Sequence, residues 1–231
     1  MSKAEVQKFL RDPFTYVKFT CINLQTPSGA GTVIPPGGFN ATQTYSPAYF
    51  DLVPWSAGLR TATTQVMLSA GTKFGSDLIA GYYVPYIAYG TIVNNGAAMV
   101  PLDNVPASNP PYKFMFTGGQ NGCSLLLLKG TQAGTVCALH YPNSDGKAAD
   151  YPLLARIGKT KADVLLAIDF DFYGTAENPN ACSFFYHDGT EWVGVTQPQV
   201  QGAINMDWKR CSMSLNGGPK RVSSKAQGYI S

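Results

Sequence analysis

Glycine and proline interrupt the apolar segments of this chain so often that long helices are excluded. The sequence has 24 Gly and 16 Pro among 231 residues, and both residue types destabilise the interior of a helix. The composition therefore argues against helical bundles and coiled coils, which depend on Ala, Glu, Lys and Leu at helical spacing. Because 45% of the residues are apolar and 12% are aromatic, it also argues against a disordered chain. A compact, turn-rich and mostly β protein remains.

One domain spanning residues 1–231 is the predicted organisation. A chain of this length can bury a sizeable core without disulfide bonds, and neither an internal repeat nor a shift in composition marks a second domain. We predict a β-dominated α+β fold, a single-domain β-sandwich flanked by a few short helices and long loops.

The spacing of apolar residues locates the first elements. Ser2 and Glu5 form a capping-box pattern, so residues 3–11 are predicted to form a short amphipathic helix that ends before Pro13. From residue 14 to residue 22 the period changes to two, which predicts a strand. The Gly- and Pro-rich residues 25–47 are predicted to form a long loop.

Further short apolar runs, each bounded by turn residues, predict the remaining strands. They cover residues 48–55, 64–70, 82–93, 113–116, 124–128, 135–141, 164–173, 183–187, 191–195 and 205–215. The dipeptide Asp188-Gly189 between two of these runs predicts a two-residue hairpin turn. Residues 146–162 are the second candidate for a helix.

The charge of the chain does not predict a nucleic-acid partner. The formal net charge is only +3, too small for the basic surface that a dedicated nucleic-acid binder carries. Basic residues without acidic ones gather in the C-terminal tail, residues 209–231. We predict a solvated tail, with contact to phosphates or to an acidic partner as the alternative.

Several patterns bear on where the protein works. No N-terminal segment combines a basic region, an apolar run and a small-residue cleavage site, so no signal peptide is predicted. Residues 78–102 carry no charge, but Gly, Pro and Asn interrupt them too often for a membrane span. Five cysteines at irregular spacing fit free thiols in a reducing compartment. We expect a monomer in the cytoplasm of the cell that makes it.

No cofactor and no metal ion is predicted. The sequence contains no CxxC pair and no His/Cys cluster with the spacing of metal ligands. The segment GAGTVI lacks the third glycine of a dinucleotide-binding fingerprint, and neither a GxSxG elbow nor a phosphate-binding P-loop is present.

Cys123 and His140 form the strongest candidate for a catalytic pair. Residues 124–128 and 135–141 are predicted to be adjacent antiparallel strands. If Thr131 and Gln132 form the tip of this hairpin, Cys123 and His140 face each other, with β-carbons about 4.5–5.5 Å apart. A slip of one residue would place the imidazole on the opposite face.

A thiol next to an imidazole has the chemistry of a nucleophile. The imidazolium stabilises the thiolate and so lowers the pKa of the thiol, and the thiolate is the reactive form. Thr117, at the end of the preceding strand, is predicted to orient the imidazole of His140 through its hydroxyl group. The alternative is that Cys123 is an ordinary buried cysteine and His140 an ordinary half-buried histidine.

The turn before the cysteine is the candidate oxyanion site. It contains Gly119, Asn121 and Gly122, and glycines allow backbone N–H groups to approach a developing negative charge. Such a site is what an acyl-transfer reaction requires.

Two other groupings are weaker candidates. Cys182 and His187 lie five residues apart on one predicted strand, so their side chains point to opposite faces. His187 is expected to be exposed beside the hairpin turn. Asp169 and Asp171 would share one face of a strand, a spacing that suits paired-carboxylate chemistry, but we favour the solvent face of an edge strand for them.

These motifs resemble a known family. The run Phe116-Thr117, four residues, Gly122-Cys123, a hydrophobic strand and then a histidine is similar to the catalytic region of the Burkholderia lethal factor family of glutamine-deamidase toxins. It is similar, more distantly, to the catalytic domain of the cytotoxic necrotizing factors. The segment Leu52-Val53-Pro54-Trp55, followed by Gly58-Leu59, resembles a second segment of the lethal factor family.

The resemblance covers residues 48–142 and assigns roles to three of them. It implies that Cys123 is the nucleophile, that His140 is its partner and that Thr117 completes the site. The chain departs from the family in carrying Gln120-Asn121 where Leu-Ser precedes the Gly-Cys pair. Its spacing from cysteine to histidine is also longer.

The resemblance implies a Cys/His glutamine deamidase, a toxin or effector that converts a Gln side chain of a host protein to Glu through a thioester. It further implies delivery into the host cytoplasm and, as substrate, a translation-initiation RNA helicase or a Rho-type GTPase. Two alternatives remain: a cysteine peptidase or transglutaminase-like acyl transferase, and a non-enzymatic β-sandwich that binds through exposed aromatic residues. The candidate aromatic residues are Trp55, Tyr82, Tyr83, Tyr86 and Trp192.

Overall fold

Two β-sheets packed face to face form the centre of the protein. The computed structural model describes residues 3–25, 48–54, 65–71, 78–86, 89–96, 98–143, 150–177, 179–201, 213–215 and 220–223. Within these residues the fold is β-dominated α+β, as predicted from the sequence, with a few short helices outside the two sheets. Of the predicted loop at 25–47, Gln25 ends the first strand, and residues 26–47 lie outside the described residues.

The larger sheet has the strand order β1-β3-β2-β4-β6-β11-β12-β13, with β7 paired to β11 and β14 paired to β12. Its strands are β1 (Cys21–Gln25), β2 (Ala48–Pro54), β3 (Gln65–Gly71), β4 (Ile79–Val84), β6 (Phe114–Thr117), β7 (Gln120–Asn121), β11 (Asn180–His187), β12 (Trp192–Gln201), β13 (Met213–Leu215) and β14 (Lys220–Ser223). The β1–β3 and β4–β6 pairs are parallel.

The smaller sheet has the order β10-β8-β9-β5. Its strands are β5 (Leu102–Pro106), β8 (Ser124–Lys129), β9 (Thr135–Tyr141) and β10 (Val164–Ile168), all antiparallel to their neighbours. The helices are α1 (Lys3–Arg11), α2 (Pro13–Phe19), α3 (Tyr89–Asn95), α4 (Phe170–Tyr173) and two 3₁₀ helices, η1 (Pro152–Ile157) and η2 (Lys161–Asp163).

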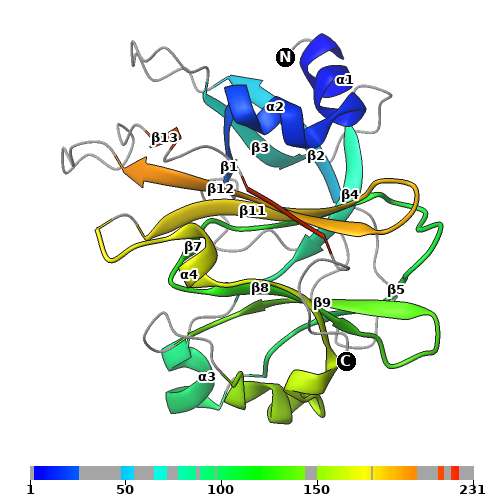
Figure 1. The fold of residues 1–231 in the computed structure, drawn as a ribbon, viewed down its shortest axis with the longest axis vertical. Coiled ribbons are helices and arrows are strands. Elements are labelled where there is room, and N and C mark those ends of the chain that lie inside the picture. The colour runs from blue at the N-terminus through cyan, green and yellow to red at the C-terminus, as the bar shows by residue number, and fades with distance from the viewer. Residues whose placement is uncertain are drawn as a thin grey trace.

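The elements form four layers, visible in Figure 1 as α1 and α2 above the larger sheet and α3 below the smaller one. Side chains of α1 and α2 pack on the outer face of the larger sheet, a second core fills the space between the sheets, and a third lies between the smaller sheet, α3 and η1. Both sheets are therefore covered on both faces. This explains the continuous apolar runs at 114–116 and 125–128, because successive residues of a strand point to opposite faces.

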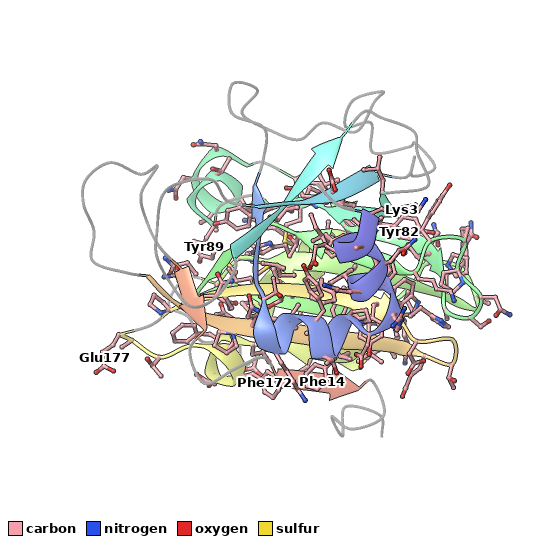
Figure 2. All side chains as sticks on the ribbon, turned by 90° about the horizontal axis from the view of Figure 1, so that it is seen from above. Lys3, Phe14, Tyr82, Tyr89, Phe172 and Glu177 are labelled. Atoms are coloured by element: carbon pink, nitrogen blue, oxygen red, sulfur yellow. The ribbon has the colours of Figure 1, made fainter. Side chains whose placement is uncertain are left out.

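Figure 2 looks onto the molecule from the side of α1 and α2, with the described side chains drawn as sticks. In this view Tyr82, within β4, lies toward the right, and Tyr89, at the start of α3, lies toward the left. Tyr82 and Tyr89 thus lie on opposite sides of this view although they are close in sequence.

The N-terminal segment corrects one prediction. The helix at 3–11 is confirmed, but residues 13–19 form α2 and not a strand. Pro13 occupies the first turn of α2, where a missing N–H costs nothing, and the Asp12 carboxylate accepts a hydrogen bond from the Thr15 N–H at 3.0 Å. The proline that ends one helix therefore starts the next.

Two long apolar runs each contain a strand and then a helix. The run at 82–93 divides into β4, which ends at Val84, and α3, which starts at Tyr89. The run at 164–173 divides into β10 and α4, so Asp169 and Asp171 do not share a strand. Only Ile92 in α3 and only Tyr173 in α4 are buried, so neither helix has enough buried positions to show a helical period in the sequence.

The β11–β12 turn, residues 146–162 and the C-terminal segment differ from the remaining predictions. The β11–β12 hairpin exists, but its loop has four residues, 188–191, because the Asp188 carboxylate accepts the N–H groups of Thr190 and Glu191. Of the candidate helix at 146–162, residues 146–149 lie outside the described residues, and the remainder holds the 3₁₀ helix η1 and the start of η2 in place of one continuous helix. Part of the predicted basic tail, Lys220–Ser223, is a strand paired with β12. In the part of the chain that the structure describes, no helix is long and apolar enough to cross a membrane.

Candidate active site

Thr117, Cys123 and His140 come together at one end of the space between the two sheets. Thr117 ends β6, Cys123 immediately precedes β8, and His140 is the last residue but one of β9. The core between the sheets contains the residue two positions along the chain from each of them: Met115, Leu125 and Ala138, respectively. Because the side-chain period of a strand is two, all three candidate residues face this inner space.

The register of the β8–β9 hairpin differs from the predicted one. His140 lies opposite Leu125, not opposite Cys123, so the hairpin is centred on Gln132 and Ala133. The shift is even, which keeps Cys123 and His140 on the same face as diagonal neighbours. Its cause lies outside the hairpin: the Asn104 side chain of β5 accepts hydrogen bonds from the Thr131 hydroxyl at 2.8 Å and the Gln132 N–H at 3.1 Å.

The Thr117 hydroxyl determines which nitrogen of His140 carries the proton. Its oxygen lies 2.8 Å from the Val84 carbonyl oxygen and 2.7 Å from His140 Nδ1. A hydroxyl has one hydrogen, and both short contacts are favourable only when that hydrogen points to the carbonyl and Nδ1–H donates to Thr117 Oγ1. Nε2 then carries the lone pair, which is the state of a general base.

Burial keeps the imidazole of His140 neutral. The residue is only 2% exposed, and burial lowers its pKa from 6.5 to about 3. Among the described residues, Nε2 is buried and has no hydrogen-bond partner. The ring of Tyr86 lies against the imidazole, with 4.5 Å between ring centroids.

The thiol of Cys123 is also neutral in the free protein. Burial raises its pKa, while hydrogen bonds from the Asn143 backbone N–H and from the Tyr86 side chain act in the opposite direction without reversing the shift. Its Sγ lies 3.9 Å from the Asn121 carbonyl oxygen, to which it donates. The expectation that His140 lowers the pKa of this thiol is therefore wrong for the free protein, because desolvation outweighs the polar contacts.

The backbone at the cysteine is held by three side chains. The Cys123 carbonyl oxygen accepts from the Tyr173 hydroxyl at 2.7 Å and from Gln120 Nε2 at 3.3 Å. The Gly122 carbonyl oxygen accepts from Asn143 Nδ2 at 2.9 Å. Gly122 has a φ of 82°, a backbone conformation that a side chain would strain.

Two of the turn residues assigned to the oxyanion site are exposed, and the third is half-buried. Asn121 ends the two-residue strand β7, which pairs with β11, and Gly119 lies just before that strand. Gly122 and Cys123 connect β7 to β8. The oxyanion role of this turn stays a prediction.

A second polar group supports the same turn from behind. The Ser124 hydroxyl donates to Asp169 Oδ1 at 2.7 Å and accepts from Asn143 Nδ2 at 3.0 Å. The Tyr151 hydroxyl also donates to the Asp169 carboxylate, at 2.8 Å from Oδ2. Burial raises the pKa of Asp169 against these hydrogen bonds. Asp169 is thus a support for the turn, not half of a carboxylate pair.

Sequence reasoning missed three residues that contact the site: Tyr86, Asn143 and Tyr173. Tyr86 and Tyr173 lie in runs that the apolar pattern assigned to strands, and both follow a strand end in the structure. Asn143 lies two residues beyond β9. In the observed register Ser124 pairs with Tyr141, so the residues just beyond β9 lie next to Cys123. A sequence analysis with this register would have found Asn143.

The weaker candidates lie elsewhere. Cys182 and His187 are both on β11. The His187 N–H donates a hydrogen bond to the carbonyl oxygen of Lys113, which directly precedes β6. His187 therefore lies at the other end of β6 from Thr117. His187 is 4% exposed, not an exposed hairpin residue as expected.

The exposed aromatic surface that the binding alternative needs is smaller than expected. Tyr82 and Trp192 are buried in the core between the sheets, whereas Tyr86 is exposed. Trp55 lies outside the described residues.

Comparisons with known proteins supply no family. No family model matches the sequence, and no curated protein matches it either. Nor do the residues described here include three or more His, Cys, Asp or Glu side chains placed to hold a metal ion. The chemistry of the site is therefore argued from its own geometry.

Proposed function

We propose that this protein is a Cys/His glutamine deamidase, a toxin or effector that converts a Gln side chain of a host protein to Glu. Cys123 is the nucleophile, His140 the general base and acid, and Thr117 the residue that orients the imidazole. The overall reaction consumes water and releases ammonia. The resemblance to the lethal factor family of deamidase toxins assigns the same three roles.

One observation carries the proposal: the hydrogen bonds of Thr117. Its hydroxyl group is 2.7 Å from His140 Nδ1 and 2.8 Å from the Val84 carbonyl oxygen. This arrangement leaves the lone pair of Nε2 free at the end of the sandwich where Cys123 lies. A buried histidine in an inert core has no need of a fixed tautomer with an unpartnered base nitrogen.

Acylation begins with two neutral groups. The thiol of Cys123 turns from the Asn121 carbonyl toward Nε2, which accepts its proton as Sγ attacks the carbon of the carboxamide. The negative charge develops on the carboxamide oxygen, next to the N–H groups of the turn at Gly122 and Cys123. The imidazolium then gives its proton to the amide nitrogen, ammonia leaves, and a thioester remains.

In deacylation His140 again acts first as a base and then as an acid. Nε2 removes a proton from a water molecule, and the resulting hydroxide attacks the thioester carbon. The bond from carbon to Sγ breaks, the thiol regains its proton from the imidazolium, and a glutamate side chain is released. Every proton moves through His140, so the reaction needs no redox step and no external acid or base.

The test is the mass change on a candidate substrate. Wild-type protein, Cys123→Ser and Cys137→Ser are incubated with a translation-initiation RNA helicase or a Rho-type GTPase, and peptides are examined for the amide-to-acid increment on one Gln. Cys137 is an equally buried cysteine of β9 on the opposite face of the smaller sheet, which makes it the matched control. We expect product with wild type and Cys137→Ser and a loss of at least about a thousandfold with Cys123→Ser.

Two results contradict the proposal. Undiminished product with Cys123→Ser excludes Cys123 as the nucleophile. A cleaved chain or an amine-linked product in place of glutamate would instead identify a peptidase or a transglutaminase, which pass through the same thioester.

A further inference from the structure

Tyr86 is an exposed side chain that lies directly on a buried pair of reactive groups. It is 44% exposed, whereas Cys123 is 6% exposed and His140 2%. The rings of Tyr86 and His140 are 4.5 Å apart at an interplanar angle of 44°. One face of the tyrosine ring therefore covers the imidazole while part of the side chain remains in contact with solvent.

The same side chain reaches the cysteine. Burial first, and then its electrostatic contact and hydrogen bond with Cys123, raise the pKa of the Tyr86 hydroxyl to about 12. The hydrogen bond from this hydroxyl favours the thiolate over the thiol, and so lowers the pKa of Cys123 against the larger effect of burial.

The position of Tyr86 follows from the end of β4. Val84, the last residue of β4, pairs with Thr117 and accepts the Thr117 hydroxyl through its carbonyl oxygen. Pro85 follows, and because it has no N–H it cannot extend the ladder of the sheet. The chain leaves the sheet here, which places the next residue over the neighbouring imidazole.

We propose that Tyr86 is a positioning residue that covers the Cys123–His140 pair and opens to admit a substrate. Its ring keeps water from the base nitrogen of His140, and its hydroxyl holds the sulfur in the resting orientation. An unbranched carboxamide side chain reaches the sulfur only when the ring moves aside. This inference rests on the proposed function for the identity of the substrate, but the covering itself is a property of the free protein.

The test uses iodoacetamide, a small uncharged reagent that itself carries a primary carboxamide. The rate of alkylation of Cys123 is followed by mass spectrometry against pH for wild type, Tyr86→Ala and Tyr86→Phe. Leu10→Ala removes an equally exposed apolar side chain on α1, on the far side of the larger sheet, and is the control. Thermal unfolding of each variant checks that the fold persists.

The two variants are expected to move in opposite directions. Tyr86→Ala removes the cover, so alkylation at neutral pH accelerates by about tenfold or more and its pH profile moves to lower pH, since one pKa unit is a factor of ten. Tyr86→Phe keeps the cover and loses the hydrogen bond to sulfur, so its profile moves to higher pH without acceleration. Leu10→Ala matches wild type.

Other outcomes overturn the inference. An unchanged rate in Tyr86→Ala shows that the ring does not cover the sulfur, and an unchanged pH profile in Tyr86→Phe shows that the hydroxyl has no role. Because alkylation is measured without any protein substrate, the covering can be established even where no deamidation is found. Conversely, deamidation with wild-type rates in Tyr86→Ala would leave the proposed function standing and remove the role of Tyr86.

Discussion

The two histidines of the protein occupy similar surroundings at opposite ends of β6. His140 and His187 are both almost fully buried, and in both the Nε2 atom has no hydrogen-bond partner within the described part of the chain. Each also contacts an aromatic ring, Tyr86 at 4.5 Å and Trp192 at 5.4 Å between centroids. Burial and an unpartnered nitrogen therefore do not distinguish a catalytic histidine from a structural one.

The hydrogen bond at Nδ1 distinguishes them. His187 Nδ1 accepts the Gly189 N–H at 3.2 Å, so its proton is on Nε2, which is then a donor. His140 Nδ1 donates to Thr117, so its Nε2 is a base. The two rings are held in opposite tautomers, and the one in the base form, His140, faces the same inner space as Cys123.

The largest difference between the two histidines is expected in activity. His140→Gln removes the base and should lower the rate of deamidation by about 10²–10⁴-fold, the usual contribution of general acid–base catalysis. His187→Gln should retain activity within a few fold. The measurement is the amount of glutamate formed on the substrate peptide per unit time, with the folded fraction of each variant determined by circular dichroism. Equal losses in both variants would contradict the assignment of His140 as the base.

A smaller effect is expected when the hydrogen bond that fixes the tautomer of His140 is removed. Thr117→Val leaves the His140 Nδ1–H without its acceptor and should lower activity by about ten- to a hundredfold, the size of effect seen when a partner that orients a functional histidine is removed. Thr117→Ser keeps the hydroxyl and should restore most of the activity.

Thr196 provides the matched control for this prediction. It is fully buried on β12 and accepts a hydrogen bond from the Ser183 hydroxyl at 2.8 Å. Thr196→Val should cost stability, because it leaves a buried group unpaired, but not the rate per folded molecule. If Thr117→Val retains the rate of wild type, Thr117 does not orient the base.

The smallest effect concerns stability against pH. His140 has a lowered pKa in the folded protein, so between pH 6.5 and about 3 the unfolded chain binds a proton that the folded protein does not. The free energy of unfolding should therefore fall as the pH is lowered through this range, by at most about 1.4 kcal/mol per pH unit from this group.

Urea unfolding at several pH values checks this prediction. His140→Gln should lose this component of the slope, whereas His187→Gln should keep it. Parallel curves for wild type and His140→Gln would mean that the imidazole is not held neutral by burial.

Local patterns predicted much of the fold. The helix at 3–11 and the strands at 48–54, 124–129 and 135–141 follow from their own apolar spacing and turn residues. The run after Pro13 was misassigned because its helix starts from a side-chain cap at Asp12, a contact that outweighs the alternating pattern. The runs after Val84 and Ile168 were misassigned because α3 and α4 each bury a single residue, Ile92 and Tyr173, which is too few to show a helical period.

The candidate site was predicted in part. Thr117, Cys123 and His140 were identified from residue types and from the hairpin, and the structure brings them to one end of the sandwich. Their resting chemistry was not predicted, because the pKa of Cys123 and of His140 depends on how much water reaches each group. Tyr86, Asn143 and Tyr173 come from separate segments, and no spacing along the chain connects them to the cysteine.

The sequence by itself determined that the chain is a turn-rich, β-dominated protein with few histidines and one cysteine in a glycine-rich turn. These properties belong to residues and their near neighbours, where conformational preference and periodicity act. The tertiary structure alone decided the hairpin register through Asn104, the tautomer of His140 through Thr117, and the placement of the Tyr86 ring against the imidazole of His140. Each of these depends on hydrogen bonds and burial between segments far apart in the chain, which only the packing of the two sheets brings together.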